Sequence, residues 1–127
     1  TPSLYKFLME QDDEARESLR ADAVAVLRFM ETEGLSKLSD GPYWMGEDLT
    51  LVDLAYYPFF ERLCVLEHYR EFSIPDDCPR LRAWVETMRF RPSVKEIENP
   101  PGFYIERYAR YASGKANSAT AREMKSA

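Results

Sequence analysis

The sequence predicts an all-α domain, a bundle of about five or six helices packed around one buried central helix. Apolar residues recur at helical spacing along most of the chain, and no segment alternates between apolar and polar residues as a strand does. The apolar stretch 49–60 carries a helix-start motif. The 127 residues are enough for one domain that buries roughly two-thirds of its unfolded surface.

The central helix is predicted over residues 50–66. Thr50 and Asp53 have the spacing of a capping box, in which each side chain accepts a hydrogen bond from the backbone N–H of the other. Leu49 and Leu54 have the spacing of a hydrophobic staple, which sets the angle at which the chain enters the helix. Few polar residues interrupt the stretch, so the helix should lie inside the domain. We therefore interpret Thr50 and Asp53 as structural rather than catalytic residues.

Pro58 lies inside this stretch. Proline has no backbone N–H, so it removes one helical hydrogen bond and leaves the Leu54 carbonyl in need of another partner. We therefore expect a bent helix, with polar residues returning at Glu61 and Arg62.

Further helices are predicted on both sides of the central one. A Thr-Pro-Ser capping signature begins the first, an acidic cluster the second, and Pro79 a third. These helices and a short turn are expected over residues 1–9, 12–34, 79–91, 92–97 and 103–111. Small polar residues follow Ser113, so the domain is expected to span 1–112 and a flexible tail 113–127.

Composition narrows the classes of function. Hydrophobic residues make up 45% of the chain and charged residues 31%, which is typical of a globular protein. The formal net charge of -5 argues against nucleic-acid or anionic-membrane binding, because phosphate recognition relies on Lys and Arg. No apolar run approaches the ~20 residues of a membrane span, and no signal-peptide pattern is present. The expected partner is a small molecule or a protein.

Cysteine and histidine are scarce. Cys64 and Cys78 are too few for a disulfide scaffold and lack metal-binding spacing, which suits the cytosol. Cys78 precedes a helix start, where a thiolate is favoured, although a structural role is the commoner one; Cys64 is expected to fill the core. His68 is the only histidine, so we expect neither a His-based metal site nor a Ser-His-Asp triad.

Two segments resemble a known family. The stretch 46–63 combines the capping box with the aromatic-Pro-aromatic segment Tyr57-Pro58-Phe59. It resembles the central helix of the C-terminal domain of glutathione transferases, most closely the omega class and related thiol-dependent reductases. The run 78–94 resembles the next helix of that family and the Pro-Xaa-Val turn after it. The resemblance covers residues 1–113 and is specific between 46 and 94.

The resemblance implies one half of a two-part enzyme. The other half, absent from this chain, would be an N-terminal thioredoxin-like domain that binds glutathione or a related thiol and carries a catalytic cysteine. The full-length parent would be a cytoplasmic homodimer that transfers thiols, as in disulfide or dehydroascorbate reduction, on small electrophilic acceptors and without a metal. This chain would supply the acceptor side and much of the dimer contact, hold no catalytic residue, and be inactive alone.

Three aromatic residues are the candidates for acceptor binding. Tyr57 matches an omega-class aromatic beside the glutathione site, although a place in the core is equally consistent with a buried helix. Tyr108 ends the segment Tyr104-Ile105-Glu106-Arg107-Tyr108, which resembles the pattern that carries a pocket tyrosine in that class. Phe103 stands where the class has a tryptophan just before this pattern, so it is the expected replacement.

Two other functions remain open. Helical domains of this family also serve as non-catalytic interaction modules in translation factors and multi-protein complexes. A ligand-holding protein that uses the aromatic cleft without chemistry is a third possibility.

Overall fold

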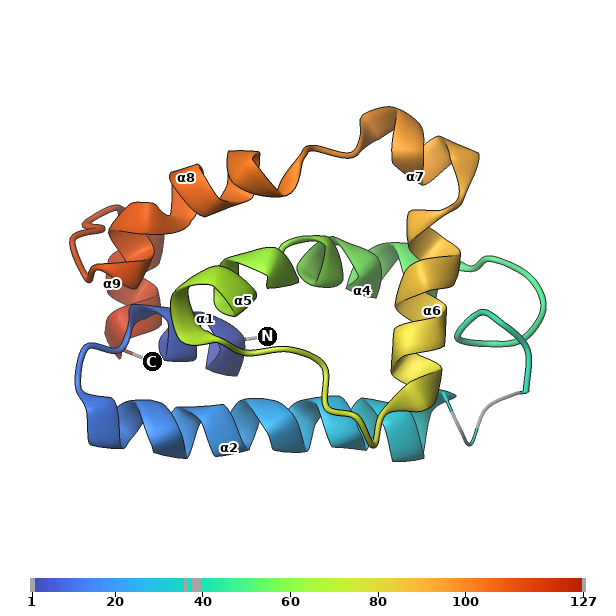
Figure 1. The fold of residues 1–127 in the computed structure, drawn as a ribbon, viewed down its shortest axis with the longest axis horizontal. Helices are drawn as coiled ribbons and strands as arrows, with labels where there is room; N and C mark the ends of the chain where they lie inside the picture. The colour runs from blue at the N-terminus through green and yellow to red at the C-terminus, as the bar shows by residue number, and fades with distance from the viewer. Residues whose placement is uncertain (1, 36, 38–39, 127) are drawn as a thin grey trace.

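A computed structural model describes residues 2–35, 37 and 40–126 (Figure 1), and the regular secondary structure within them is all helical. The predicted fold class is confirmed. The elements are α1 (Pro2–Met9), α2 (Asp13–Phe29), the π-helical turn η1 (Met30–Leu35), α4 (Leu51–Glu61), α5 (Leu63–Arg70), α6 (Pro79–Arg89), α7 (Pro92–Ile97), α8 (Pro101–Ala112) and α9 (Ala119–Ser126). Thr1, which the sequence predicts as part of a capping signature, lies outside the described residues.

The α4–α5 pair organises the bundle. Figure 1 shows this pair running through the middle of the molecule, with the long helix α2 along one side and α6 across one end. α5 packs against α1 and α8, while α4 packs against α6. The pair therefore has neighbours on several sides, and two hollows in the surface lie against it.

Asp53 anchors the start of α4 and is completely buried. Thr50 and Asp53 form a capping box, and the carboxylate accepts the Thr50 N–H at 2.9 Å. It also accepts the Trp44 N–H at 2.9 Å and the Trp84 indole N–H at 2.7 Å. Burial alone would raise the pKa of Asp53, but the hydrogen bonds from Trp44, Thr50 and Trp84 outweigh it, so the pKa lies below its usual value. The cap thus joins α4 to the preceding loop and to α6.

α4 buries one face only. Asp53 and Tyr57 point into the core, whereas Leu51 is 82% exposed and Leu54 49% exposed. Leu49 is half-buried against the core. The sequence predicts burial on all sides because the helix has hardly any polar residue, but no described element covers the side that carries Leu51 and Leu54.

The helix predicted over 50–66 is divided at Arg62, four residues after Pro58. The Arg62 N–H bonds to the Phe60 carbonyl instead of continuing the α-helical ladder, and its guanidinium donates to the Pro58 carbonyl at 3.1 Å. The structure therefore has a break where the sequence predicts a bend.

Arg70, at the end of α5, holds three helices together from inside. Its buried guanidinium donates to the backbone carbonyls of Phe7 (3.2 Å), Leu8 and Ala112 (2.9 Å). These carbonyls belong to the last turns of α1 and α8, which have no helical donor of their own. One side chain therefore closes the ends of α1 and α8 onto α5.

The segment expected to be a tail contains a helix. α9 packs against α1, and Ala116 and Ala121 are buried. The sequence did not predict the contact between α9 and α1, because this segment has small residues and no strong apolar stripe. The domain boundary and the flexibility of 113–127 stay predictions.

Candidate functional site

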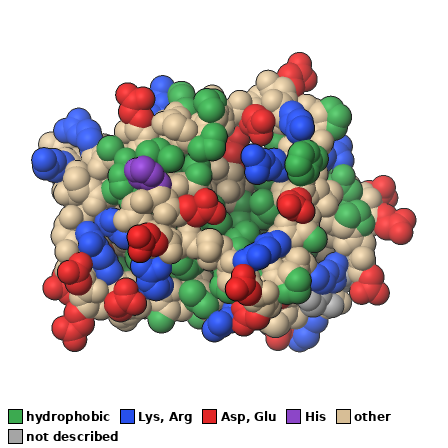
Figure 2. Space-filling model, in the orientation of Figure 1, with side chains coloured by type: hydrophobic (Ala, Val, Ile, Leu, Met, Phe, Trp, Pro, Cys, Tyr) green, Lys and Arg blue, Asp and Glu red, His purple; other side chains and the backbone are tan. Residues whose placement is uncertain are grey.

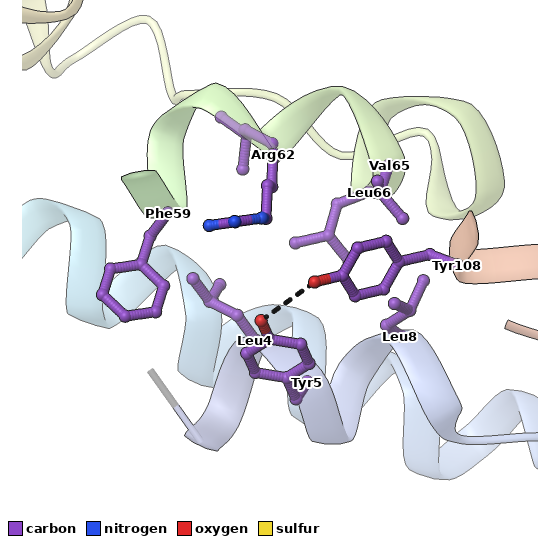
Figure 3. Close-up of a pocket in the computed structure, with 9 residues that line it drawn as sticks. Leu4, Tyr5, Leu8, Phe59, Arg62, Val65, Leu66 and Tyr108 are labelled. Atoms are coloured by element: carbon purple, nitrogen blue, oxygen red, sulfur yellow. Dashed lines mark hydrogen bonds between the residues drawn. The ribbon is translucent and has the colours of Figure 1, made fainter. Parts of the chain in front are cut away.

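A small apolar pocket lies where α1, the Arg62 break, α5 and α8 meet (Figure 3). We call it the tyrosine pocket; it is lined by Leu4, Tyr5, Leu8, Phe59, Arg62, Leu63, Val65, Leu66 and Tyr108. Its cavity measures about 40 Å³. Sites that enclose a small organic ligand usually measure about 300–1,000 Å³. The pocket can therefore form one wall of such a site rather than the whole.

Two phenols face each other in this pocket. The hydroxyl groups of Tyr5 and Tyr108 lie 3.4 Å apart, and their ring centres are 6.2 Å apart. Figure 3 shows the two hydroxyls pointing toward one another from α1 and α8. Burial, and then the hydrogen bond with Tyr108, raise the pKa of Tyr5 to about 12. Tyr5 is thus neutral at neutral pH, and its hydroxyl can donate to or accept from Tyr108.

Arg62 supplies the positive charge of the pocket. Figure 3 shows its guanidinium group lying above Leu4, between Phe59 on one side and Tyr108 on the other. The same group lies over the Tyr104 ring, 5.4 Å from its centre, and donates to the Pro58 carbonyl. A guanidinium has five N–H donors, so it can bond to a ligand while it keeps the Pro58 contact.

The groups that line the tyrosine pocket are suited to binding and orienting a ligand, and none of them is a thiol. Its apolar walls suit an apolar ligand, the phenols can donate to an oxygen, and the guanidinium attracts negative charge. Cys64 lies on α5 beside Leu63 but lines a different hollow. Burial, and then Glu67, raise the pKa of the Cys64 thiol. No cysteine lines the tyrosine pocket, so the pocket itself offers no thiolate.

The second hollow lies between α4, α5, α6 and the segment that leads into α8, and we call it the acidic hollow. Its cavity is larger, about 270 Å³. Carboxylates from Glu61, Glu67 and Glu98 line it together with Arg89.

The three residues predicted to bind the acceptor do not meet in one pocket. Tyr108 lines the tyrosine pocket, whereas Tyr57 is buried on α4 and lines the acidic hollow. Phe103 lines neither of the two; it packs edge-on against Tyr104, with the Arg107 guanidinium 4.2 Å from its ring centre. Whether any of the three contacts a ligand stays a prediction.

Sequence reasoning missed Tyr5, Phe59 and Arg62 as lining residues. Arg62 had a usable signal, because it stands one helical turn after Pro58 and is the first cation after the apolar stretch. The sequence signal for Tyr5 was weak, because it consists only of nearness to the apolar positions Leu4 and Leu8 on the same helix. No local pattern shows that Tyr5 meets Tyr108, 103 residues later.

The described part of the chain offers little support for a metal site, a membrane-spanning helix or a reactive cysteine. No group of three His, Cys, Asp or Glu side chains there is arranged to hold a metal ion. None of its helices is long and apolar enough to cross a membrane. Cys78 immediately precedes α6, but burial and then Asp77 and Glu31 raise the pKa of its thiol, which opposes a reactive thiolate.

Comparison with known proteins identifies the family. The model for the glutathione S-transferase C-terminal domain matches residues 13–87. Glutathione S-transferase L2, chloroplastic, from Arabidopsis thaliana is 33% identical over 85 residues, or 66% of this chain and 29% of the relative. Glutathione S-transferase U19 of the same plant is 34% identical over 88 residues, 68% of this chain and 38% of the relative.

Protein IN2-1 homolog A from Oryza sativa subsp. japonica is 31% identical over 107 residues, 84% of this chain and 41% of the relative. No solved structure gives a significant match. The chain thus spans between 29% and 41% of the length of these three relatives. The family prediction is confirmed, while closeness to the omega class stays a prediction. Because the family model covers more than half of the chain, this protein belongs to the glutathione S-transferase C-terminal domain family.

Proposed function

We propose that this chain is the acceptor-side domain of a longer glutathione transferase, and that the tyrosine pocket is its wall of the acceptor site. One observation carries the proposal: the pocket gathers apolar walls, two phenols and a guanidinium, but no thiol. Such a set can position an acceptor while glutathione, bound mainly by another domain, supplies the sulfur. The small volume of the pocket agrees with a site that a second domain completes.

The residues that line the tyrosine pocket have different roles in this proposal. Leu4, Leu8 and Phe59 hold the apolar body of the acceptor. The hydroxyl of Tyr108 donates to an oxygen of the acceptor, and Tyr5 fixes the Tyr108 ring through their mutual contact. Arg62 attracts an acceptor that is anionic or that becomes so during reaction.

The finer proposal is omega-like thiol transfer in a cytoplasmic homodimer. Two glutathione thiols are oxidised to a disulfide, and a disulfide or dehydroascorbate-type acceptor takes up two electrons and two protons. Phe103 and Tyr57 remain candidates for acceptor contact through the family resemblance.

The test is a set of single substitutions in a longer protein that contains this chain. Tyr108→Phe should lower kcat/KM for a carbonyl-bearing acceptor about tenfold, the value of one hydrogen bond in the transition state, and leave the KM for glutathione unchanged. Tyr111→Phe is the matched control, because its hydroxyl lies on the same helix but contacts Ser118 at 3.4 Å. Tyr57→Phe and Phe103→Leu test the other two candidates. Equal kinetic constants for Tyr108→Phe and the control would disprove this role of the pocket.

A second candidate is a non-catalytic interaction module. The exposed apolar residues Leu51, Leu54 and Tyr56 on α4 favour it, since a protein contact would cover them. The full-length parent separates the two functions: thiol-dependent turnover supports the enzyme, and its lack together with a stable protein complex supports the module.

A further inference from the structure

The acidic hollow lies on the face seen in Figure 2, where hydrophobic side chains gather in a depression with charged side chains around it. Tyr57 and Phe60 from α4, Val85 from α6 and Ile74 from the loop before α6 supply the apolar part of its lining. Its cavity of about 270 Å³ is close to the range of about 300–1,000 Å³ in which proteins hold small organic molecules. The hollow therefore has room for a one- or two-ring ligand.

Negative charge dominates the lining. Glu61, Glu67 and Glu98 line the hollow, and Arg89 is the cation among the lining residues. The segment from Glu98 to Pro101 forms the rim toward α8, so carboxylates come from both the α4–α5 pair and this rim. A ligand inside would be close to acidic side chains on two sides.

A hydrogen-bond chain holds one of these carboxylates in place. The side-chain amide of Asn99 donates to the Tyr104 hydroxyl at 3.2 Å, and that hydroxyl donates to Glu61 Oε2 at 3.0 Å. Tyr104 is 5% exposed, so this arrangement is anchored in the core. Glu61 has a second carboxylate oxygen, which can accept a hydrogen bond from a ligand while the first keeps the bond from Tyr104.

The groups around the hollow respond to this charge. Burial raises the pKa of Tyr57, and Glu61 and Glu98 raise it further. Burial also raises the pKa of Tyr104, and Glu61 adds to the effect. Both tyrosines are thus kept in their neutral form, as expected where the electrostatic potential is negative. The same potential attracts a cation and repels an anion.

We propose that the acidic hollow binds an organic cation: a ligand with a protonated amine bound by Glu61 and Glu98 and an apolar one- or two-ring body packed on Phe60, Ile74 and Val85. The ammonium group forms charge-assisted hydrogen bonds with the carboxylates. Burial of the rings supplies the hydrophobic part of the affinity. The site needs neither glutathione nor another domain, so it stands or falls independently of the proposed transferase function.

Equilibrium dialysis of the 127-residue chain against three ligands of matched shape tests the proposal. These are 1-naphthylmethylammonium, 1-naphthalenemethanol and 1-naphthoate, which carry positive, no and negative charge at neutral pH. We expect saturable binding of the ammonium compound, with the alcohol bound about tenfold more weakly and the carboxylate weaker still. Added salt should weaken the ammonium compound most, because the carboxylates are partly exposed to solvent.

Substitutions then locate the bound cation. Glu61→Gln with Glu98→Gln should weaken the ammonium compound about tenfold or more, while a glutamine oxygen can still accept the Tyr104 hydrogen bond. Glu96→Gln is the control, since it removes one negative charge from α7 but does not line the hollow. Val85→Trp should reduce binding of all neutral and cationic probes by filling the space. Circular dichroism melting verifies that each variant is folded.

The proposal is overturned by any of three results. The first is no saturable binding of the ammonium compound up to millimolar concentration. The second is equal affinity for the alcohol, which would mean that the carboxylates do not select the ligand. The third is an equal loss of affinity in the Glu96→Gln control and the double variant, which would mean a general charge effect instead of a site.

Discussion

The tyrosine pocket and the acidic hollow are built against the same pair of helices but differ in charge. Glu61, the last residue of α4, lines the acidic hollow, and Arg62, the next residue, lines the tyrosine pocket. Glu61 accepts a hydrogen bond from Tyr104, whereas the Arg62 guanidinium lies over the ring of that same tyrosine. Adjacent side chains of opposite charge are thus directed to different hollows.

Glu61 and Arg62 stand at the end of a helix, and this position serves two sites. Adjacent side chains on a helix are about 100° apart, which is enough to direct these two to different sides. The α-helical ladder ends at Arg62, whose guanidinium donates to the Pro58 carbonyl. If the two hollows are independent, some substitutions should damage both of them and others only one.

Asp53→Ala should have the largest effect, because this buried carboxylate fixes α4 to Trp44 and to Trp84 of α6. The substitution leaves two buried N–H groups without their acceptor, and we expect a loss of about 3–5 kcal/mol in the free energy of unfolding. Urea unfolding followed by tryptophan fluorescence measures this loss. Asp48→Ala, an exposed carboxylate in the preceding loop, is the control. Equal midpoints for the two variants would contradict the anchoring role of Asp53.

Arg62→Met should separate the hollows. In a longer protein that contains this chain, KM for an anionic acceptor should rise about tenfold, since one charge-assisted contact is lost. The affinity of the acidic hollow for 1-naphthylmethylammonium should stay the same, because Arg62 does not line it. Arg107→Met, whose guanidinium lies over Phe103 instead, is the matched control. A parallel change at both sites would mean that Arg62 maintains the fold of the pair rather than one pocket.

Tyr5→Phe should have the smallest effect on stability, below about 1 kcal/mol at neutral pH, because it removes one long hydrogen bond. The pKa of Tyr5 is raised in the folded protein to about 12. Its contribution to stability is therefore fully present below the ordinary tyrosine pKa of about 10 and is lost as the pH rises through the folded value. Spectrophotometric titration of the phenolate band should show that the variant lacks a tyrosine titrating near 12. Loss of a group titrating near 10 would contradict the buried position.

Local sequence signals predicted much of the fold. Thr50 stands directly before α4 and Asp53 lies in its first turn, while Pro79 is the first residue of α6 and Pro92 is the first residue of α7. Each of these residues affects a helix start within one turn of itself, so a pattern of neighbouring residues is enough to predict that start. The all-helical class follows from the same periodicity.

Contacts between residues far apart in the sequence could not be predicted from such local patterns. The Glu31 carboxylate accepts the backbone N–H groups of Arg80 at 2.9 Å and Leu81 at 2.7 Å, so η1 caps α6 from 49 and 50 residues away. A capping residue is normally sought immediately before its helix, where Cys78 makes no such side-chain bond. The buried face of α9 has the same explanation, since its contact with α1 joins the two ends of the chain.

The candidate site was predicted least completely. Resemblance placed Tyr57 and Tyr108 in one cleft, but a sequence pattern does not say to which side of a broken helix each residue points. The structure places them in different hollows. The sequence interpretation also left out Arg62, which lines the same pocket as Tyr108.

The contacts of Arg70 also bear on the order in which the domain folds. Two of the last carbonyls of α1, those of Phe7 and Leu8, accept hydrogen bonds from a guanidinium that is 63 and 62 residues away in the sequence. Such distant contacts close late because the intervening chain must first be ordered. We expect α1 to dock after α4, α5 and α6 have assembled. A partly folded chain would then already have the side of the acidic hollow formed by those three helices, while the tyrosine pocket still lacked the wall that α1 provides.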